Sequence, residues 1–251
     1  MSRRLFGGST LLLALAALLV VPLAGQWLAL LVPITGVAVA IGSEVVARLH
    51  PDFGSARGRK LDGFWIGPGL SVVAAALAAS QAEPTVARVL GLSGVAMLAL
   101  LLAAQDRELS GHRDGGLLSL AYAVVLYLVA FALFVTIYGQ RDQVVLGTLG
   151  VGLAATVLGL ALYRPTGAPI RRAWVYAGLS GLCVAEMTLV AEFWISGGLL
   201  GGAFLLLFFY VAAGLVQAHF EGSLTSRLVA EYTVVGALGL GLIIWASPWR
   251  G

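Results

Sequence analysis

The chain contains little charge and only one residue each of cysteine and lysine. Charged residues make up 11% of its 251 residues, against about 25% in a soluble domain. Hydrophobic residues make up 60%, against about 45–50%. The single cysteine, Cys183, excludes disulfides and cysteine-based metal clusters within one chain. The single lysine, Lys60, lies in a polar loop, which excludes a retinal Schiff base in mid-membrane. The net charge of +3 is spread along the chain, so we expect no nucleic-acid partner.

Common catalytic and cofactor motifs are also missing from the sequence. It has no phosphate-cradling glycine loop, paired-aspartate motif or nucleophile elbow. The histidines His50, His112 and His219 lie outside the middle of the apolar stretches, and no two are three or four residues apart. Buried haem ligation and a helical zinc motif are therefore not expected. We predict no metal, no other cofactor and no catalytic residue, while a site built from all three histidines at one membrane face stays open.

Long hydrophobic segments dominate the sequence. Nine of them approach the roughly 20 residues that a spanning helix needs. They are 5–23, 27–49, 64–80, 86–104, 116–138, 144–163, 172–194, 197–219 and 229–246. We predict an all-α polytopic transmembrane bundle of nine spans, with eight as the alternative, in a single integral membrane domain over residues 1–251. Residues 1–25 also resemble a signal peptide, but the next apolar run begins at Trp27, which favours an uncleaved first helix.

The arginines and the lysine predict an orientation, because short cytoplasmic loops are enriched in cations. With the N-terminus inside and nine crossings, twelve of the fifteen cations fall inside and three, Arg88, Arg141 and Arg250, fall outside. We therefore predict a multi-pass protein with its N-terminus inside and its C-terminus outside.

Glycine is abundant, with 33 residues, many at spacings that bring small residues onto one helix face. In membranes such residues let helix backbones approach closely, so we expect tight packing, with a dimerisation face as the alternative. The sequence Gly-Leu-Ser-Gly occurs at 91–94 and at 178–181 and matches a short motif of rhomboid-type intramembrane proteases. That chemistry needs a histidine at the depth of Ser180, and His219 lies nearer the membrane surface.

Two glutamates lie inside the seventh apolar stretch. Glu186 is three residues from the middle of 172–194, or about 5 Å, and is our candidate buried carboxylate. An ionisable group in hydrocarbon is costly and is a functional-site hypothesis. The explanation favoured over it is a structural carboxylic acid, hydrogen-bonded to a hydroxyl such as that of Tyr122 or Tyr127. Glu192 lies nearer the outer interface, where we expect an outer ion pair with Arg88.

Two further ion pairs are predicted within single helices. Glu44 and Arg48 are four residues apart near an inner end, and Arg227 and Glu231 repeat that spacing. Opposite charges at this spacing meet on a helix surface, so both are expected to be local pairs.

The last third of the chain carries a recognisable series of motifs. They are Glu192-Phe193-Trp194, Gln217-x-His219, Leu224-Thr225-x-Arg227 and Glu231-Tyr232. This third resembles uncharacterised multispanning membrane proteins of bacteria, Chloroflexota-like ones among them. The resemblance implies a multi-pass protein of the bacterial cytoplasmic (inner) membrane, and no function. It also points to an inner-face polar cluster of Gln217, His219, Thr225, Arg227 and Glu231, for which a capped helical turn is the alternative explanation.

Three classes of function follow. The short loops, many small residues and absence of a catalytic motif favour a non-enzymatic structural or accessory subunit of a membrane complex. The alternative is a small transporter or channel that uses Glu186 as its coupling carboxylate, and an intramembrane enzyme is least favoured. The expected partners are the lipid bilayer and either other membrane subunits or further copies of the chain.

Overall fold

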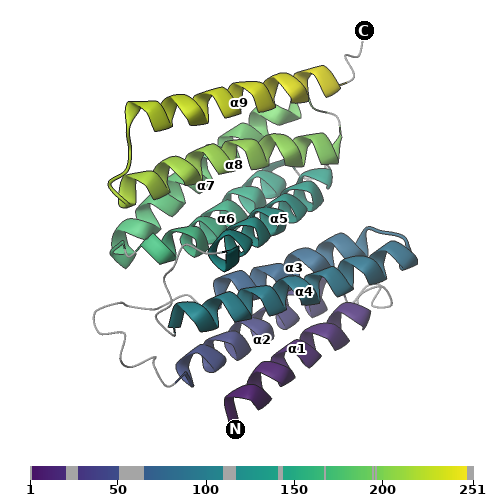
Figure 1. Cartoon of the computed structure of the whole chain (residues 1–251). Helices are drawn as coiled ribbons and strands as arrows, with labels where there is room; N and C mark the ends of the chain where they lie inside the picture. Colours follow the sequence, from purple (N-terminus) through teal and green to yellow (C-terminus); the bar gives the residue numbers. More distant parts are fainter. Residues whose placement is uncertain are drawn as a thin grey trace. The chain divides into compact units, whose positions relative to one another are not determined.

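The structure, a computed structural model, describes residues 2–20, 28–50, 65–109, 117–140, 144–166, 168–193, 195 and 197–247. Regular structure in these residues is helical throughout (Figure 1). The helices are α1 (Ser2–Val20), α2 (Leu28–Arg48), α3 (Ile66–Ser80), α4 (Pro84–Leu109), α5 (Leu117–Gly139), α6 (Val144–Tyr163), the 3-10 turn η4 (Arg164–Thr166), α7 (Ile170–Glu192), α8 (Gly198–Phe220) and α9 (Ser226–Ala246).

The predicted all-α polytopic bundle is confirmed. Each of the nine predicted stretches coincides with one α-helix, and the sixth has the predicted bounds. Seven helices in the described residues are long and apolar enough to span a bilayer. The apolar parts of the other two are shorter: Gly7–Leu18 in α1 and Ile66–Ser80 in α3. The chain is therefore a multi-pass membrane protein.

The chain divides into two compact units, Met1–Val129 and Ala130–Gly251, which are described separately. In the first unit α3 packs against α2 and α4, and α1 packs against α2 and α4 (Figure 1). Ala14 and Leu18 of α1 are buried in the core of this unit, together with Val72 and Leu98. That the first helix is retained rather than cleaved stays a prediction.

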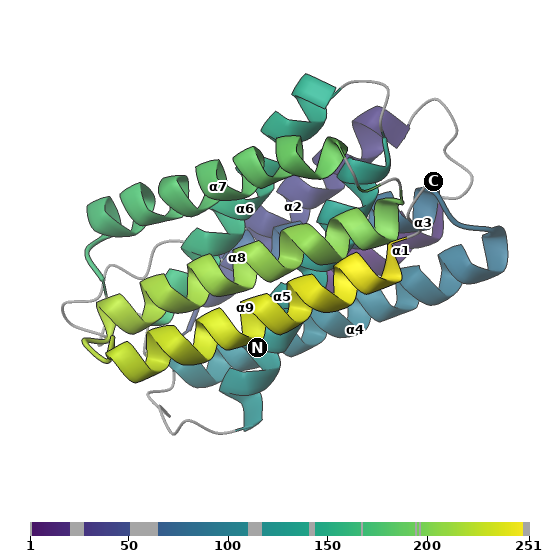
Figure 2. The ribbon, with the colours of Figure 1, turned by 90° about the horizontal axis from the view of Figure 1, so that it is seen from above.

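In the second unit α6 packs along α7, α7 along α8, and α8 along α9 (Figure 2). The second half of α5 joins α8 through an edge-to-face contact between Phe134 and Phe209, whose centroids are 5.8 Å apart. Tyr138 donates a hydrogen bond of 2.8 Å to the carbonyl of Ile195, which precedes α8. Helix α9 contacts α8 along one side, and Ile243 is the one buried residue of α9.

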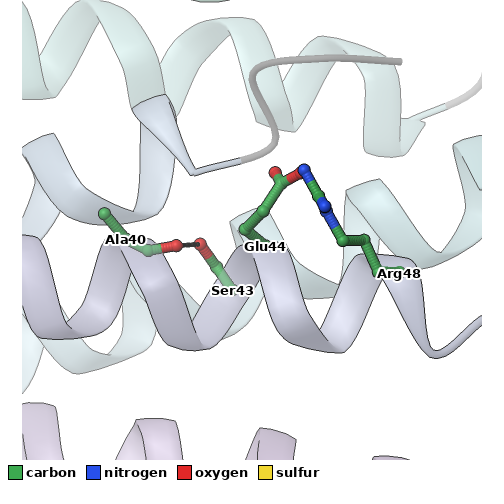
Figure 3. A network of polar contacts seen from close by, with 4 residues as sticks. All are labelled: Ala40, Ser43, Glu44 and Arg48. Carbon is green, nitrogen blue, oxygen red and sulfur yellow. Dashed lines mark hydrogen bonds and ion pairs between the residues drawn. The ribbon is translucent and has the colours of Figure 1, made fainter. Parts of the chain in front are cut away.

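Both local ion pairs predicted from the sequence are confirmed. Arg48 Nε lies 2.9 Å from Glu44 Oε1 on α2. The residue before Glu44, Ser43, donates to the Ala40 carbonyl (Figure 3). Arg227 Nε lies 3.1 Å from Glu231 Oε1 on α9. The first carboxylate is mostly buried and the second is exposed, and both pairs neutralise charge near helix ends.

The repeated Gly-Leu-Ser-Gly sequence is a helix-packing element. A Cβ atom on Gly181 would lie 2.5 Å from the carbonyl oxygen of Gly152, because α6 and α7 approach closely here. In the other copy a Cβ on Gly94 would overlap the Cβ of Ala75 in α3. The second glycine of each copy thus permits close contact between helices, as expected from small residues within membranes.

We expect Gly181→Ala to lower the stability of the second unit by about 1–3 kcal/mol, because the added methyl group meets backbone that cannot move aside cheaply. Gly178→Ala is the matched control, since a Cβ there meets nothing within 4 Å. Alanine has a higher helix propensity than glycine, which favours the helix by about 1 kcal/mol in both variants. Thermal unfolding in mild detergent should show a lower midpoint for Gly181→Ala alone, and equal midpoints would contradict the close contact.

Candidate functional site

Helix α7 has two opposite faces, which follow from its turn of about 100° per residue. The buried face carries small or medium residues: Ala173, Ala177, Ser180, Gly181, Val184, Thr188 and Ala191. The opposite face is exposed and bulkier. We call its central residues, Val175, Leu179, Leu182, Glu186 and Val190, the α7 stripe; they follow one another at spacings of three or four.

Glu186 is the polar member of the α7 stripe and is exposed. The second unit does not bury its carboxylate, because the small residues on the opposite side of α7 form the packing face. Within that unit no hydrogen bond or ion pair joins Glu186 to a described residue. The predicted partners Tyr122 and Tyr127 belong to the first unit, so those contacts stay predictions.

The depth of Glu186 also differs from the expectation. Helix α7 begins at Ile170, two residues before the predicted start, so its centre is Gly181. Glu186 is five residues from this centre, about 7.5 Å along the axis rather than about 5 Å. It remains inside the apolar span, about 9 Å from the last helical residue, Glu192.

The predicted outer ion pair of Glu192 with Arg88 joins residues of different units and stays a prediction. Glu192 ends α7 and is half-buried, whereas Arg88 lies in the second turn of α4 and is exposed.

The predicted inner-face cluster divides into two groups of residues. Gln217 and His219 face the neighbouring helices: Gln217 Nε2 donates to the Leu162 carbonyl at 3.0 Å, and His219 Nε2 lies 3.2 Å from the Tyr176 hydroxyl. Gln217 therefore satisfies one of the last carbonyls of α6, which has no partner within its own helix.

The other three residues belong to the start of α9. Thr225 caps this helix by accepting a hydrogen bond from the Leu228 amide, and Arg227 pairs with Glu231. The preceding helix, α8, ends at Phe220, and Gly222 follows with a φ of +68° and an amide that donates to the His219 carbonyl. This αL termination and the Thr225 cap satisfy helix-end groups, as in a capped turn.

Ser180, the serine of the second Gly-Leu-Ser-Gly copy, sits in a buried hydroxyl chain. Its Oγ donates to the Tyr176 carbonyl at 2.9 Å and lies 2.8 Å from the Tyr163 hydroxyl, which must then be the donor. Both Ser180 and Tyr163 are buried. These hydrogen bonds connect α6 to α7. His219 contacts the Tyr176 hydroxyl and not Ser180.

A groove at this end of the second unit was not predicted from the sequence. It has a volume of about 680 Å³ and lies between the turn before α7, the start of α7 and the end of α8. Its lining comprises Thr166, Ala168, Pro169, Arg171, Arg172, Val175, Tyr176, His219 and Phe220. We call this the basic groove, because its charged lining residues are arginines and its remaining ionisable groups are a histidine and a tyrosine.

Aromatic rings form one wall of the basic groove. Tyr176 meets Phe220 edge to face at 5.0 Å, and its ring centroid lies 5.4 Å from that of His219. Phe220 also meets Tyr163 edge to face at 5.7 Å. These contacts link the groove wall to the buried Tyr163–Ser180 pair and hold Tyr176 in place.

The two histidines that the structure describes, His50 and His219, belong to different units. His50 is buried in the first unit, with Nε2 3.7 Å from Asp106 Oδ1 of α4, whereas His219 belongs to the second unit. His112 lies outside the described residues. Among the residues that the structure does describe, no group of three His, Cys, Asp or Glu side chains could hold a metal ion.

The fold and these side chains define a multi-pass helical membrane protein. Within that class, the chain belongs to a family of proteins of unknown function, DUF5656, whose model matches residues 8–246. The match covers nearly the whole chain, so the family likeness extends well beyond the last third in which the sequence motifs were recognised. No curated protein and no solved structure matches the chain.

A double-mutant cycle tests the hydroxyl chain. Hydrogen bonds between membrane helices contribute ~0.6 kcal/mol on average and up to ~1.7 kcal/mol. Because Tyr163 and Ser180 are both buried, we expect Tyr163→Phe and Ser180→Ala to show a coupling energy of about 1 kcal/mol in unfolding titrations.

The control pairs Tyr163→Phe with Thr188→Ala. Thr188 donates to the Val184 carbonyl of its own helix, so its effect should add to that of Tyr163→Phe. Additivity in both cycles would show that the Tyr163–Ser180 contact does not contribute to stability.

Proposed function

We propose that this protein is a non-enzymatic subunit of a membrane complex, and that the α7 stripe is where a helix of a separate membrane subunit docks. The observation that carries this proposal is the exposed carboxylate of Glu186 inside an otherwise apolar span. The partner helix is expected to present a hydrogen-bond donor, either a cation or a hydroxyl, at the depth of Glu186.

The argument is energetic. A charged side chain facing lipid costs about 2.5–3.5 kcal/mol at the helix centre on insertion scales, and intramembrane carboxylates accordingly pair with a donor or face a cavity. Glu186 is five residues from the centre of α7 but still inside the apolar span. The bulky neighbours Leu179 and Leu182 are apolar and are stable in contact with lipid, but lipid offers no hydrogen-bond donor to Glu186. A donor on a docked helix supplies the interaction that the second unit leaves unmade.

Helix α9 gives the contrasting case. Its large exposed residues in mid-span are apolar, with Val234, Leu238 and Leu242 at 56%, 66% and 65% exposed, and the exposed hydroxyl of Thr233 donates to the Val229 carbonyl. Lipid satisfies such a surface, so an exposed helix alone does not call for a protein partner. What distinguishes the α7 stripe is its carboxylate.

A transporter that couples through Glu186 has less support. Coupling needs a hydrated cavity at the carboxylate, whereas the basic groove is lined on α7 only as far as Tyr176. Tyr176 precedes Glu186 by ten residues, about 15 Å along the helix. An enzyme at the inner face would use Arg227 and Glu231 with His219, but these two charges are occupied with each other.

The orientation remains part of the proposal: a bacterial cytoplasmic membrane, with the N-terminus and the α8–α9 turn inside. In a Cys183→Ser background, Gln140→Cys, after α5, should react with a membrane-impermeant maleimide in intact cells. Ser223→Cys, in the α8–α9 turn, should react only after lysis. The reverse pattern would overturn the orientation.

Site-specific photo-crosslinking tests the docking surface. A photoreactive residue at Leu182 should form an adduct with one defined membrane protein in native membranes, identified by mass spectrometry. Glu186→Leu should abolish that adduct, because the partner's donor loses its acceptor. Leu238, in α9, is the matched control: it is 66% exposed against 58% for Leu182, and should crosslink to lipid with or without Glu186.

Three results would contradict the proposal. Adducts at Leu182 to lipid alone would mean that the α7 stripe faces the bilayer. An adduct to the first unit of the same chain would mean that the protein covers Glu186 itself, and one to another copy would replace the separate subunit with a homo-oligomer. Size-exclusion profiles and helical content of the Glu186→Leu variant check that the loss of adduct is not a loss of fold.

A further inference from the structure

We propose that the basic groove binds a phosphate group, with an anionic phospholipid headgroup as the source that its lining favours. This inference is independent of a partner at Glu186, because it uses the opposite end of α7 and a different set of side chains.

The two arginines are available for a ligand. Arg171 and Arg172 lie in the first turn of α7, line the groove and are exposed. Neither forms a hydrogen bond or an ion pair with any residue in the described part of the chain. None of the nine lining residues is acidic, so no carboxylate within the groove competes for them.

Their position is unfavourable for the helix itself. The start of a helix carries partial positive charge, so cations in the first turn are mildly destabilising. A preference for cations at the cytoplasmic side accounts for charge in this region. It does not account for two guanidinium groups that share one groove with the hydroxyl of Tyr176 and the imidazole of His219.

The chemistry of the lining fits a phosphate. Guanidinium groups bind phosphate oxygens through paired, charge-assisted hydrogen bonds. Tyr176 lies one turn after Arg172 on α7, and His219 lines the groove from α8. Phe220 packs edge to face against the Tyr176 ring. A phosphate held by Arg171 and Arg172 would therefore meet further polar groups on a preformed wall.

The apolar surroundings favour a lipid over a free phosphate ester. Val175 lines the groove and also begins the α7 stripe, which continues through Leu179 and Leu182. Trp174, beside it, is 54% exposed at the level where indole rings favour the membrane interface. A headgroup in the groove would thus have an exposed apolar surface along which its acyl chains could lie.

Binding can be measured on the purified full-length protein in nanodiscs. Native mass spectrometry after exchange into mixed phosphatidylglycerol and phosphatidylcholine should show phosphatidylglycerol retained at least tenfold over phosphatidylcholine. The double variant Arg171→Gln, Arg172→Gln should lose this preference, whereas Arg171→Lys, Arg172→Lys should retain part of it, since charge remains but paired hydrogen bonding does not.

Arg227→Gln is the matched control. It removes one cation at the same end of the second unit but outside the groove lining, and it should leave the preference unchanged. Tyr176→Phe retains the aromatic wall and removes one hydroxyl, so it should weaken retention about two- to fivefold without loss of fold.

A second arm separates the two sources of phosphate. Inorganic phosphate and glycerol 3-phosphate are added to protein in neutral detergent, and the thermal unfolding midpoint is measured. Stabilisation by these small anions that is lost in the double glutamine variant would support the site with a free phosphate ester as its ligand. Equal retention of both lipids without anion stabilisation, or the same loss in Arg227→Gln as in the double variant, would overturn the proposal.

Discussion

The absence of water from the hydrocarbon core is the constraint on which this structure depends. A polar group there must form its hydrogen bonds within the protein, so the backbone is helical. Side chains bond to backbone groups at helix ends, which have no partner within the helix. Ser43, Ser71 and Thr188 donate to carbonyls three or four residues earlier, and Gln217 reaches from α8 to a carbonyl that ends α6. Against this background an exposed carboxylate inside an apolar span lacks a partner, which is why Glu186 carries the functional argument.

Helix α7 shows how packing creates that situation. Association within membranes depends on close contact, so the side of the helix with glycine, alanine and serine turns inward and the bulky side turns outward. Gly181 meets Gly152 on the inner side, and the buried Tyr163–Ser180 pair fixes the same interface. Glu186, two residues after Val184, is placed about 200° from it and therefore outside. Near the start of α7, the Tyr176 ring packs against His219 and Phe220 at the end of α8. These rings form one wall of the basic groove.

The sequence predicted what depends on composition and local spacing. Each of the nine apolar stretches corresponds to one α-helix in the residues that the structure describes, and the four-residue spacings predicted the Glu44–Arg48 and Arg227–Glu231 pairs. The direction of Glu186 was not predicted, although the periodic small residues from Ala173 to Ala191 mark the packing face and could have indicated it. The basic groove was out of reach, because it requires Tyr176 to meet His219, 43 residues later, and such convergence depends on how helices pack.

A structure of the protein extracted from its native membrane with its partners retained, determined by electron cryo-microscopy in lipid nanodiscs, tests the central claim most directly. The account predicts a helix of a different chain packed along Val175 to Val190, with a donor atom about 2.7–3.2 Å from a Glu186 carboxylate oxygen. Density for acyl chains alone around Glu186, or a contact between Glu186 and the first unit of its own chain, would contradict it.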